Sequence, residues 1–142
     1  MRWRDRENIM LTMSEMPLIA RAKARGDRVA IIAEGRTFTY RDLLEASSRA
    51  AGCLLGGARD LCEARVAFLA PPGFDYAATQ WGAWRAGGIA VPLSLSSPRP
   101  ELEYVIADCG AKVVVAHPDL EAAVRPIAGA RGLRLEIGRA HV

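Results

Sequence analysis

The chain has 142 residues, 51% of them hydrophobic and 25% charged, which is long enough for one domain with a hydrophobic core and too short for most multi-domain enzymes. No apolar run approaches the roughly 20 residues that a transmembrane helix needs, so a membrane span is excluded. The net charge of +3 comes from residues 1–41, with 9 basic and 5 acidic side chains, whereas residues 42–142 have 10 and 11. Since no basic run or stripe with interleaved aromatic residues occurs, we expect no nucleic-acid partner.

Cysteine usage points to a reducing compartment. Cys53, Cys62 and Cys109 form no CxxC pair, and neither His117 nor His141 stands at a metal-ligand spacing from them. We interpret the three as small buried thiols rather than as a disulfide scaffold or a zinc site. The amino terminus resembles neither a transit peptide nor a secretory signal, because acidic residues alternate with its arginines and no apolar stretch follows. The expected location is cytoplasmic.

The first predicted element is a β-hairpin, preceded by a poorly determined N-terminal segment, residues 1–25. Val29–Ala33 is apolar and favours a strand, Glu34-Gly35 is a turn signal, and residues 36–40 again favour a strand.

A helix is expected directly after the hairpin. Thr39 is placed to cap it, and Asp42, three residues later, completes a short capping box. Apolar residues recur at helical spacing up to Leu55. Gly56-Gly57 then ends the helix, because glycine adopts the left-handed conformation of a C-cap.

From residue 65 onward, apolar strands alternate with helical patterns. This alternation predicts βαβ units on a mainly parallel sheet, so the expected fold class is α/β, an N-terminal hairpin and helix followed by βαβ units. Ser97 and Pro98 are expected as the N-cap and first residue of one helix, and Pro126 is expected to interrupt another. The expected elements are strand 66–70, helix 74–86, strand 89–93, helix 98–109, strand 112–116, a helix from 119 and strand 133–137.

Few residues offer chemistry. The chain has no P-loop, no GxGxxG turn, no GxSxG elbow and no HExxH motif. Pro71-Pro72-Gly73 follows a predicted parallel strand, where open α/β sheets bind ligands, but its prolines lack the N–H groups of a phosphate cradle, which favours a structural loop. The pairs Gly56-Gly57 and Gly87-Gly88 fit helix ends. His117 is a candidate general base, but no sequence neighbour supplies a nucleophile or an orienting carboxylate, which favours a surface histidine at a strand end.

Two further groups of residues have both a functional and a structural interpretation. Trp81 and Trp84 are a candidate aromatic ligand platform, yet their helical spacing favours core packing, with Gly82 letting a neighbouring element approach closely. A candidate carboxylate cluster is better explained as a solvated helix face; it comprises Glu101, Glu103 and Asp108. No residue is therefore assigned as catalytic, cofactor-binding or metal-binding.

Two segments of the hairpin and first helix, Gly26–Ala30 and Thr37–Leu43, are followed in chain order by the strand Arg65–Leu69 and by Trp84–Leu93. Together they resemble the motifs of adenylate-forming enzymes, the AMP-dependent synthetase/ligase superfamily that includes the acyl-CoA synthetases. Trp84–Leu93, an alanine- and glycine-rich helix end that runs into a strand with a proline, is similar to the second core motif of that superfamily. Ala78–Trp84 and Leu102–Ile106 are most similar to malonyl-CoA synthetase-like members. The resemblance covers roughly residues 26–128 and also includes Gly26–Ala30, Thr37–Leu43, Arg65–Leu69, Glu101–Asp108 and Ala111–Ala116.

The resemblance implies that residues 26–142 are part of the N-terminal domain of an ATP-dependent acid–CoA ligase. Such a parent enzyme turns a small carboxylic acid and ATP into an acyl-adenylate, from which coenzyme A displaces AMP; its cofactors would be ATP, Mg²⁺ and coenzyme A. The phosphate loop of the family, which ends in Pro-Lys-Gly, its adenine-binding motif, its hinge and its C-terminal lysine are absent from these residues. The isolated chain is therefore expected to be inactive, and no family site residue is carried over.

Two other functions stay open. A stand-alone Rossmann-like nucleotide-binding module would show the same alternation, but it should carry a glycine-rich turn where Pro71-Pro72-Gly73 stands. A non-catalytic interaction or dimerisation domain would fit the lack of catalytic residues. The sequence determines neither the acyl substrate nor the oligomeric state.

Overall fold

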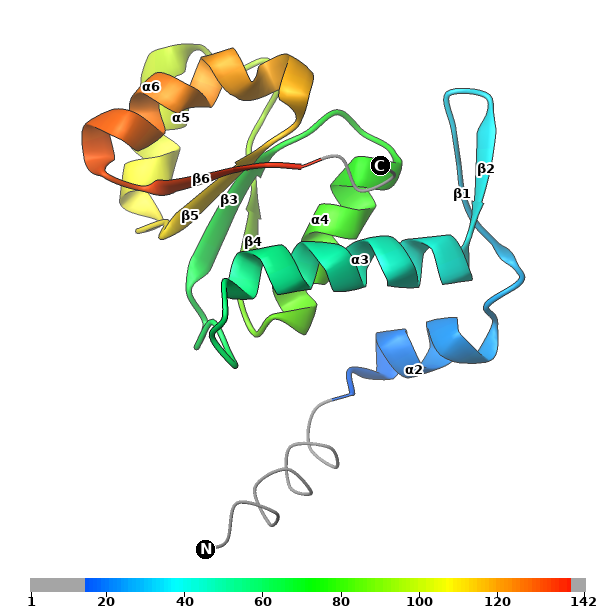
Figure 1. Cartoon of the computed structure of the whole chain (residues 1–142). Coiled ribbons are helices and arrows are strands. Elements are labelled where there is room, and N and C mark those ends of the chain that lie inside the picture. The colour runs from blue at the N-terminus through cyan, green and yellow to red at the C-terminus, as the bar shows by residue number, and fades with distance from the viewer. Residues whose placement is uncertain (1–14, 139–142) are drawn as a thin grey trace, which may run out of the picture.

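The fold combines a small β-hairpin with a parallel sheet that carries helices on both faces (Figure 1). The structure is a computed structural model and describes residues 15–138. Its elements are α2 (Pro17–Ala24), β1 (Val29–Ala33), β2 (Arg36–Thr39), α3 (Tyr40–Leu55), β3 (Arg65–Leu69), α4 (Phe74–Arg85), β4 (Ile89–Pro92), α5 (Arg99–Asp108), β5 (Val113–Ala116), the 3-10 helix η1 (Pro118–Leu120), α6 (Glu121–Arg131) and β6 (Arg134–Ile137).

The predicted hairpin and the helix after it are confirmed. β1 and β2 pair antiparallel, and Glu34 and Gly35 turn the chain with φ of 53° and 71°, the left-handed values that a tight two-residue hairpin requires. Thr39 caps α3 through a full capping box: its N–H donates to Asp42 Oδ2 at 2.8 Å, and the Asp42 N–H donates to Thr39 Oγ1 at 3.2 Å. Gly56 ends α3 with φ of 54°.

The predicted α/β class is also confirmed, with four parallel strands in the order β4-β3-β5-β6. Strand β3 lies between β4 and β5, the two strands that follow it in the sequence. The chain therefore moves from β3 to β4 on one side and then crosses back to β5 on the other side of β3. The direction of strand addition therefore reverses between β3 and β5. In open α/β sheets such a switch point leaves a crevice at the carboxyl ends of the two strands, where ligands commonly bind.

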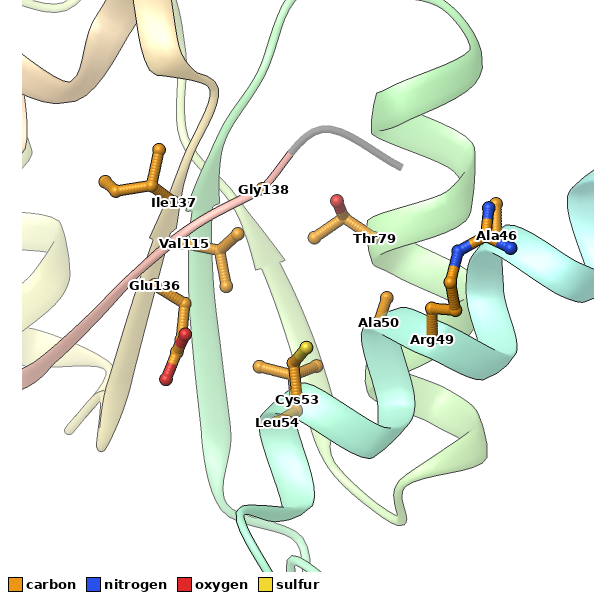
Figure 2. A pocket seen from close by; sticks show the side chains of 10 residues that line it. All are labelled: Ala46, Arg49, Ala50, Cys53, Leu54, Thr79, Val115, Glu136, Ile137 and Gly138. Carbon is orange, nitrogen blue, oxygen red and sulfur yellow. The ribbon is translucent and has the colours of Figure 1, made fainter. Parts of the chain in front are cut away.

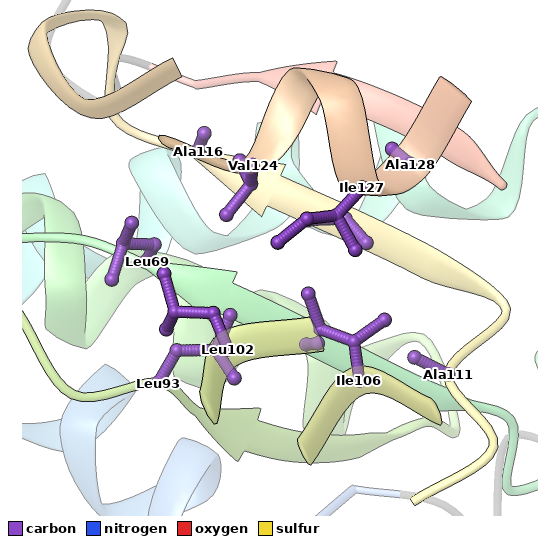
Figure 3. Close-up of a cluster of buried hydrophobic side chains, with 11 residues drawn as sticks. Leu69, Leu93, Leu102, Ile106, Ala111, Ala116, Val124, Ile127 and Ala128 are labelled. Carbon is purple, nitrogen blue, oxygen red and sulfur yellow. The ribbon is translucent and has the colours of Figure 1, made fainter. Parts of the chain in front are cut away.

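Helices cover each face of the sheet, α5 and α6 on one side and α3 and α4 on the other (Figure 1). Val66 and Phe68 of β3 are at most 1% exposed, as expected for a continuous apolar strand between two helical layers. Figure 3 shows the cluster on the α5–α6 side, where Ile106 and Ile127 meet over the sheet. That cluster is formed by Ala67, Leu69, Leu93, Leu102, Ile106, Ala111, Val114, Ala116, Val124, Ile127 and Ala128.

Three details differ from the expectation. Helix α2 lies in a region for which no element was predicted; it is short and packs through two residues, Ile19 and Ala22, both 3% exposed. Helix α5 has Pro98 as its N-cap, one residue later than predicted, and Ser97 does not cap it. Pro126 does not interrupt α6. The proline ring is exposed, while burial of the neighbouring apolar face holds the helix together at the cost of one backbone hydrogen bond.

Candidate functional site

The switch-point crevice brings together a histidine and an aspartate from distant parts of the chain. Asp75 stands in the first turn of α4, just after β3, and His117 directly follows β5. His117 Nε2 lies 3.5 Å from Asp75 Oδ2, and the two side chains are only 12% and 11% exposed. The expected surface histidine without an orienting carboxylate was therefore wrong. No sequence spacing reveals this pair, because only the adjacency of β3 and β5 places the residues side by side.

Both ring nitrogens of His117 have a partner. The backbone N–H of Asp119 donates to Nδ1 at 3.2 Å, which caps η1, so the neutral ring carries its proton on Nε2, toward Asp75. The Asp119 carboxylate lies 3.6 Å from Nδ1 on the other side. A general base needs a free nitrogen lone pair, and here that lone pair accepts the cap hydrogen bond. The arrangement therefore ties the end of β5 to the start of α4 and offers no base to a substrate.

The β1–β2 hairpin covers the crevice. An aromatic stack anchors it: the rings of Phe38 and Phe74 lie 4.0 Å apart at 13°, and the Arg36 guanidinium lies 5.0 Å from the Phe38 ring centre. The remaining cavity has about 70 Å³ and is lined by Ala33, Glu34, Arg36, Phe38, Pro71, Pro72, Gly73, Phe74, Asp75 and His117. A cavity of this size has room for about two waters, far below the several hundred Å³ of a nucleotide-sized site.

A second cavity, of about 210 Å³, lies between α3 and the end of β6 (Figure 2). Its walls are mostly apolar, from Ala50 and Leu54 on the helix to Val115 on the sheet. The charged groups of its lining are Arg49 and Glu136, of which Glu136 accepts a hydrogen bond from Arg134 Nε at 2.7 Å. The cavity therefore suits a small apolar group and brings no acid–base pair together. Its full lining is Ala46, Arg49, Ala50, Cys53, Leu54, Thr79, Val115, Glu136, Ile137 and Gly138.

The tryptophans have different surroundings. Trp81 packs against the cluster around Phe38 and Leu43, as core packing predicted. Trp84 is half-buried and lines an open groove of about 470 Å³ between α2 and the end of α4. Arg59 and Asp60 also line this groove, so both charge signs surround the indole. Neither tryptophan lies in the switch-point crevice.

The cysteines were predicted to be buried, and this was wrong for all three. Cys53 and Cys62 are exposed, and Cys109 is half-buried; all three are free thiols. Cys53 stands near the end of α3, where it lines the cavity between this helix and the end of β6 (Figure 2). Cys62 lies in the loop before β3, where it has φ of 50°. The exposure of Cys53 and Cys62 depends on where α3 and the loop before β3 lie in the fold. The spacing of the cysteines in the sequence does not indicate this.

Acidic groups form no metal centre in the part of the chain that the structure describes, where no group of three potential ligands meets the geometry of a metal site. Glu101 and Asp108 are exposed on α5 and Glu103 is half-buried. His141 lies outside the described residues.

Arg41 and Asp27 form an ion pair far from the crevice. Arg41 Nη2 donates a hydrogen bond to Asp27 Oδ1 at 2.5 Å. This hydrogen bond and the attraction between the two opposite charges raise the pKa of Arg41.

Comparison with known proteins identifies the family. The family model described as AMP-binding enzyme matches residues 18–138, which is most of the chain. This chain belongs to the AMP-binding enzyme family. The resemblance to adenylate-forming enzymes is thereby confirmed, and the match begins within helix α2.

Malonate–CoA ligases are among the similar proteins of this AMP-binding enzyme chain. The mitochondrial malonate–CoA ligase ACSF3 of Homo sapiens is 37% identical over 126 residues, which cover 84% of this chain and 21% of the relative. The malonate–CoA ligase of Arabidopsis thaliana is 30% identical over 125 residues, which cover 78% of this chain and 21% of the relative. The chain thus spans about a fifth of the length of the curated relatives it matches.

Solved structures agree on the fold. Apo MatB from Rhodopseudomonas palustris matches with a TM-score of 0.69 at 28% identity, over 86% of this chain and 26% of MatB. VinN matches with a TM-score of 0.72 at 27% identity, over 84% of this chain and 32% of VinN. The described residues of this AMP-binding enzyme chain include no helix long and apolar enough to cross a membrane.

Proposed function

We propose that this chain is the amino-terminal part of an ATP-dependent acid–CoA ligase, which converts a carboxylate and ATP into an acyl-adenylate and then into an acyl-CoA. The observation that carries the proposal is the family match over residues 18–138, together with the malonate–CoA ligases among its relatives. Malonate is accordingly the first acid to test. The CoA-ligase relatives also include a feruloyl-CoA synthase of Amycolatopsis, so an aromatic acid belongs in the same substrate panel.

We also propose that the 142-residue chain does not catalyse adenylation alone. Adenylation needs a cationic group at the phosphates and a cavity that holds a nucleotide. In the family that this chain resembles, that group is a lysine. The two lysines of this chain lie away from the crevice: Lys23 pairs with Glu15, and Lys112 is exposed before β5. The crevice at the carboxyl ends of β3 and β5 is about 70 Å³. His117, the base nearest to it, is committed to two structural contacts.

The switch-point crevice does not fit ATP, Mg²⁺ or coenzyme A, because its cavity has only about 70 Å³. No described cluster of acidic residues would hold Mg²⁺, and Pro71 and Pro72 offer no N–H group to a phosphate. No step of the reaction is therefore assigned to a residue of this chain. Its role in the ligase would be structural: βαβ units that position segments which supply the catalytic groups.

The compartment we propose is the cytoplasm. Support comes from the three free cysteines, two of them exposed, which a reducing environment preserves. The human relative is named as mitochondrial, and fractionation of the source cells would separate the two compartments.

The experiment that tests the function is ATP–pyrophosphate exchange with a panel of acids that includes malonate. The purified chain is expected to give no acid-dependent exchange, whereas an intact malonate–CoA ligase run in parallel gives exchange. Exchange by the isolated chain would contradict its assigned inactivity. To test the parent activity, residues 18–138 would replace the matching segment of the malonate–CoA ligase of Arabidopsis thaliana; formation of malonyl-CoA is expected, and a folded chimera without activity would contradict the proposal.

A further inference from the structure

The cavity between α3 and the end of β6 has a buried floor and an exposed rim. On its floor, Leu54 and Val115 are 2% and 7% exposed. On its rim, Arg49 and Cys53 of α3 are exposed, so the cavity opens to the surface at these two residues. Figure 2 shows Thr79 of α4 and Val115 of β5 facing the space from two sides. Buried apolar walls can therefore be reached from outside the domain.

Small side chains leave this space unfilled. Helix α3 lines it with Ala46, Ala50 and Cys53, whereas the larger Ile106 and Ile127 close the cluster on the opposite face of the sheet (Figure 3). The cavity has about 210 Å³. An apolar cavity of about 150 Å³ is already large enough to bind benzene. The space therefore suits one aromatic or large aliphatic side chain.

The polar groups around the cavity already have partners. Glu136 accepts a hydrogen bond from Arg134, which in turn donates to the Leu54 carbonyl at 3.1 Å. Within residues 15–138, no buried side-chain nitrogen or oxygen lacks a hydrogen-bond partner. A polar group that entered the cavity would lose its bonds to water and gain none there. The expected occupant is therefore apolar.

The end of β6 lies at the wall of this cavity. Ile137 and Gly138 both line it, and the Gly138 N–H donates to the Ala116 carbonyl at 3.1 Å, which holds the chain against the sheet up to this point. The family match also ends at residue 138, and the chain spans about a fifth of the malonate–CoA ligases it matches. In the ligase proposed above, the polypeptide that follows Gly138 therefore starts beside the cavity.

We propose that, in the intact ligase, the segment that follows Gly138 docks along α3 and inserts one apolar side chain into this cavity. The inference rests on the proposed function, because the docking segment belongs to the longer enzyme. Docking would bury the walls of the cavity and cover the Cys53 thiol on its rim. Helix α3 would thus be the surface through which these βαβ units position the part of the ligase that follows them.

A second copy of the chain is the competing occupant. One inserted side chain buries far less than the roughly 1,200 Å² that a stable interface between separate proteins requires. A segment tethered at Gly138 needs no such area, because the tether gives it a high effective concentration at the cavity. The tethered segment is therefore favoured.

Alkylation of Cys53 tests the proposal. The 142-residue chain is compared with the chimera in which residues 18–138 replace the matching segment of the Arabidopsis thaliana malonate–CoA ligase. Iodoacetamide labelling, measured at each cysteine by peptide mass spectrometry, should be about tenfold or more slower at Cys53 in the chimera, because the thiol reacts only when the segment undocks. Cys62, which is exposed in the loop before β3 and does not line the cavity, is the internal control and should react equally fast in both proteins.

The labelling result is independent of the activity of the chimera. Equal rates at Cys53 in the two folded proteins overturn the docking proposal, whether or not malonyl-CoA is formed. A folded chimera that protects Cys53 but makes no malonyl-CoA supports the docking and contradicts the proposed function. Protection of Cys53 that appears in the 142-residue chain alone as its concentration rises would assign the cavity to a second copy and contradict the tethered segment.

Cys53→Phe provides a second test, because the added ring can fill the cavity. In the 142-residue chain its melting temperature should stay the same or rise, since an empty space is filled. In the chimera the ring takes the place of the docked side chain, so hydrogen exchange in the segment after residue 138 should become about tenfold faster. Ser48→Phe, at an exposed position of α3 that does not line the cavity, is the matched control and should leave this exchange unchanged. Exchange that does not respond to Cys53→Phe contradicts the proposal.

A synthetic peptide makes the test independent of the folding of the chimera. Its sequence is the segment that directly follows the matched residues in the Arabidopsis thaliana ligase. At millimolar concentration it should slow the labelling of Cys53 in the 142-residue chain and leave the labelling of Cys62 unchanged. Cys53→Phe should prevent the peptide from binding, which isothermal titration calorimetry measures. A peptide that neither binds nor protects Cys53 counts against the docking.

Discussion

A Cβ atom at Gly82 would lie 2.6 Å from the Cβ of Ala50, which is shorter than the non-bonded contacts that Cβ atoms make in proteins. Helices α3 and α4 therefore cross with their backbones nearly in contact, and the same Cβ would lie 3.2 Å from both the Ser47 carbonyl oxygen and the Ala51 nitrogen. The backbone atoms cannot move aside as a flexible side chain would. This contact confirms the prediction that Gly82 lets a neighbouring element approach closely.

Gly82→Ala should lower the free energy of unfolding by about 1–3 kcal/mol, because overpacking at the helix crossing outweighs the better helix propensity of alanine. Gly52→Ala is the matched control: Gly52 lies within α3, a methyl group there would have no neighbour within 4 Å, and the substitution should raise the free energy of unfolding by roughly 0.5–1 kcal/mol. Urea unfolding measures both. Equal effects of the two substitutions would show that α3 and α4 can separate at little cost.

Arg134 connects β6 to the end of α3. Its Nη1 donates to the Leu54 carbonyl at 3.1 Å, and Nη2 donates to the carbonyl of Cys53. Carbonyl groups at a helix C-terminus lack intrahelical partners, and a cation also interacts favourably with the helix dipole there. Arg134→Met should therefore lower the free energy of unfolding by about 1–3 kcal/mol. Arg131→Met, an exposed arginine in the last turn of α6, should cost less than about 0.5 kcal/mol in the same urea titration.

Local patterns predicted the elements because their causes are local. Val66–Leu69 is apolar at every position and becomes the doubly covered central strand, and Thr39 and Asp42 cap α3 from within three residues. The site was not predictable in the same way. His117 meets Asp75, and Arg134 meets Leu54, only because the sheet order brings distant segments together. Helix α2 was missed for a related reason: two buried residues in eight leave too short a pattern to recognise.

Thiol reactivity checks the corrected burial of the cysteines. Cys53 and Cys62 are exposed, whereas the Cys109 thiol is half-buried and donates to the Ile106 carbonyl at 3.5 Å. Reaction of the native chain with a thiol reagent such as DTNB should therefore show two fast groups and one slow group. Cys53→Ser and Cys62→Ser should each remove one fast group and leave the slow group in place. A single fast thiol in the wild type would contradict the exposure of one of these two side chains.

His117 has two contacts that substitutions can separate. Asparagine at this position retains a side-chain oxygen that can accept the Asp119 N–H and cap η1, but it is too short to keep the contact with Asp75. His117→Asn should therefore lower the free energy of unfolding by less than about 1 kcal/mol, and His117→Ala by about 1–2 kcal/mol, since alanine loses both contacts.

Asp75→Asn completes this comparison. It removes the carboxylate that faces Nε2 while it leaves the cap on η1 intact, so its effect should resemble that of His117→Asn. The double variant Asp75→Asn with His117→Asn should lose less stability than the sum of the two single losses, because both substitutions remove one shared contact. Urea unfolding measures the wild type, the two single variants and the double variant under the same conditions. Full additivity would mean that the two side chains contribute independently, and that the contact across the crevice does not hold β5 to α4.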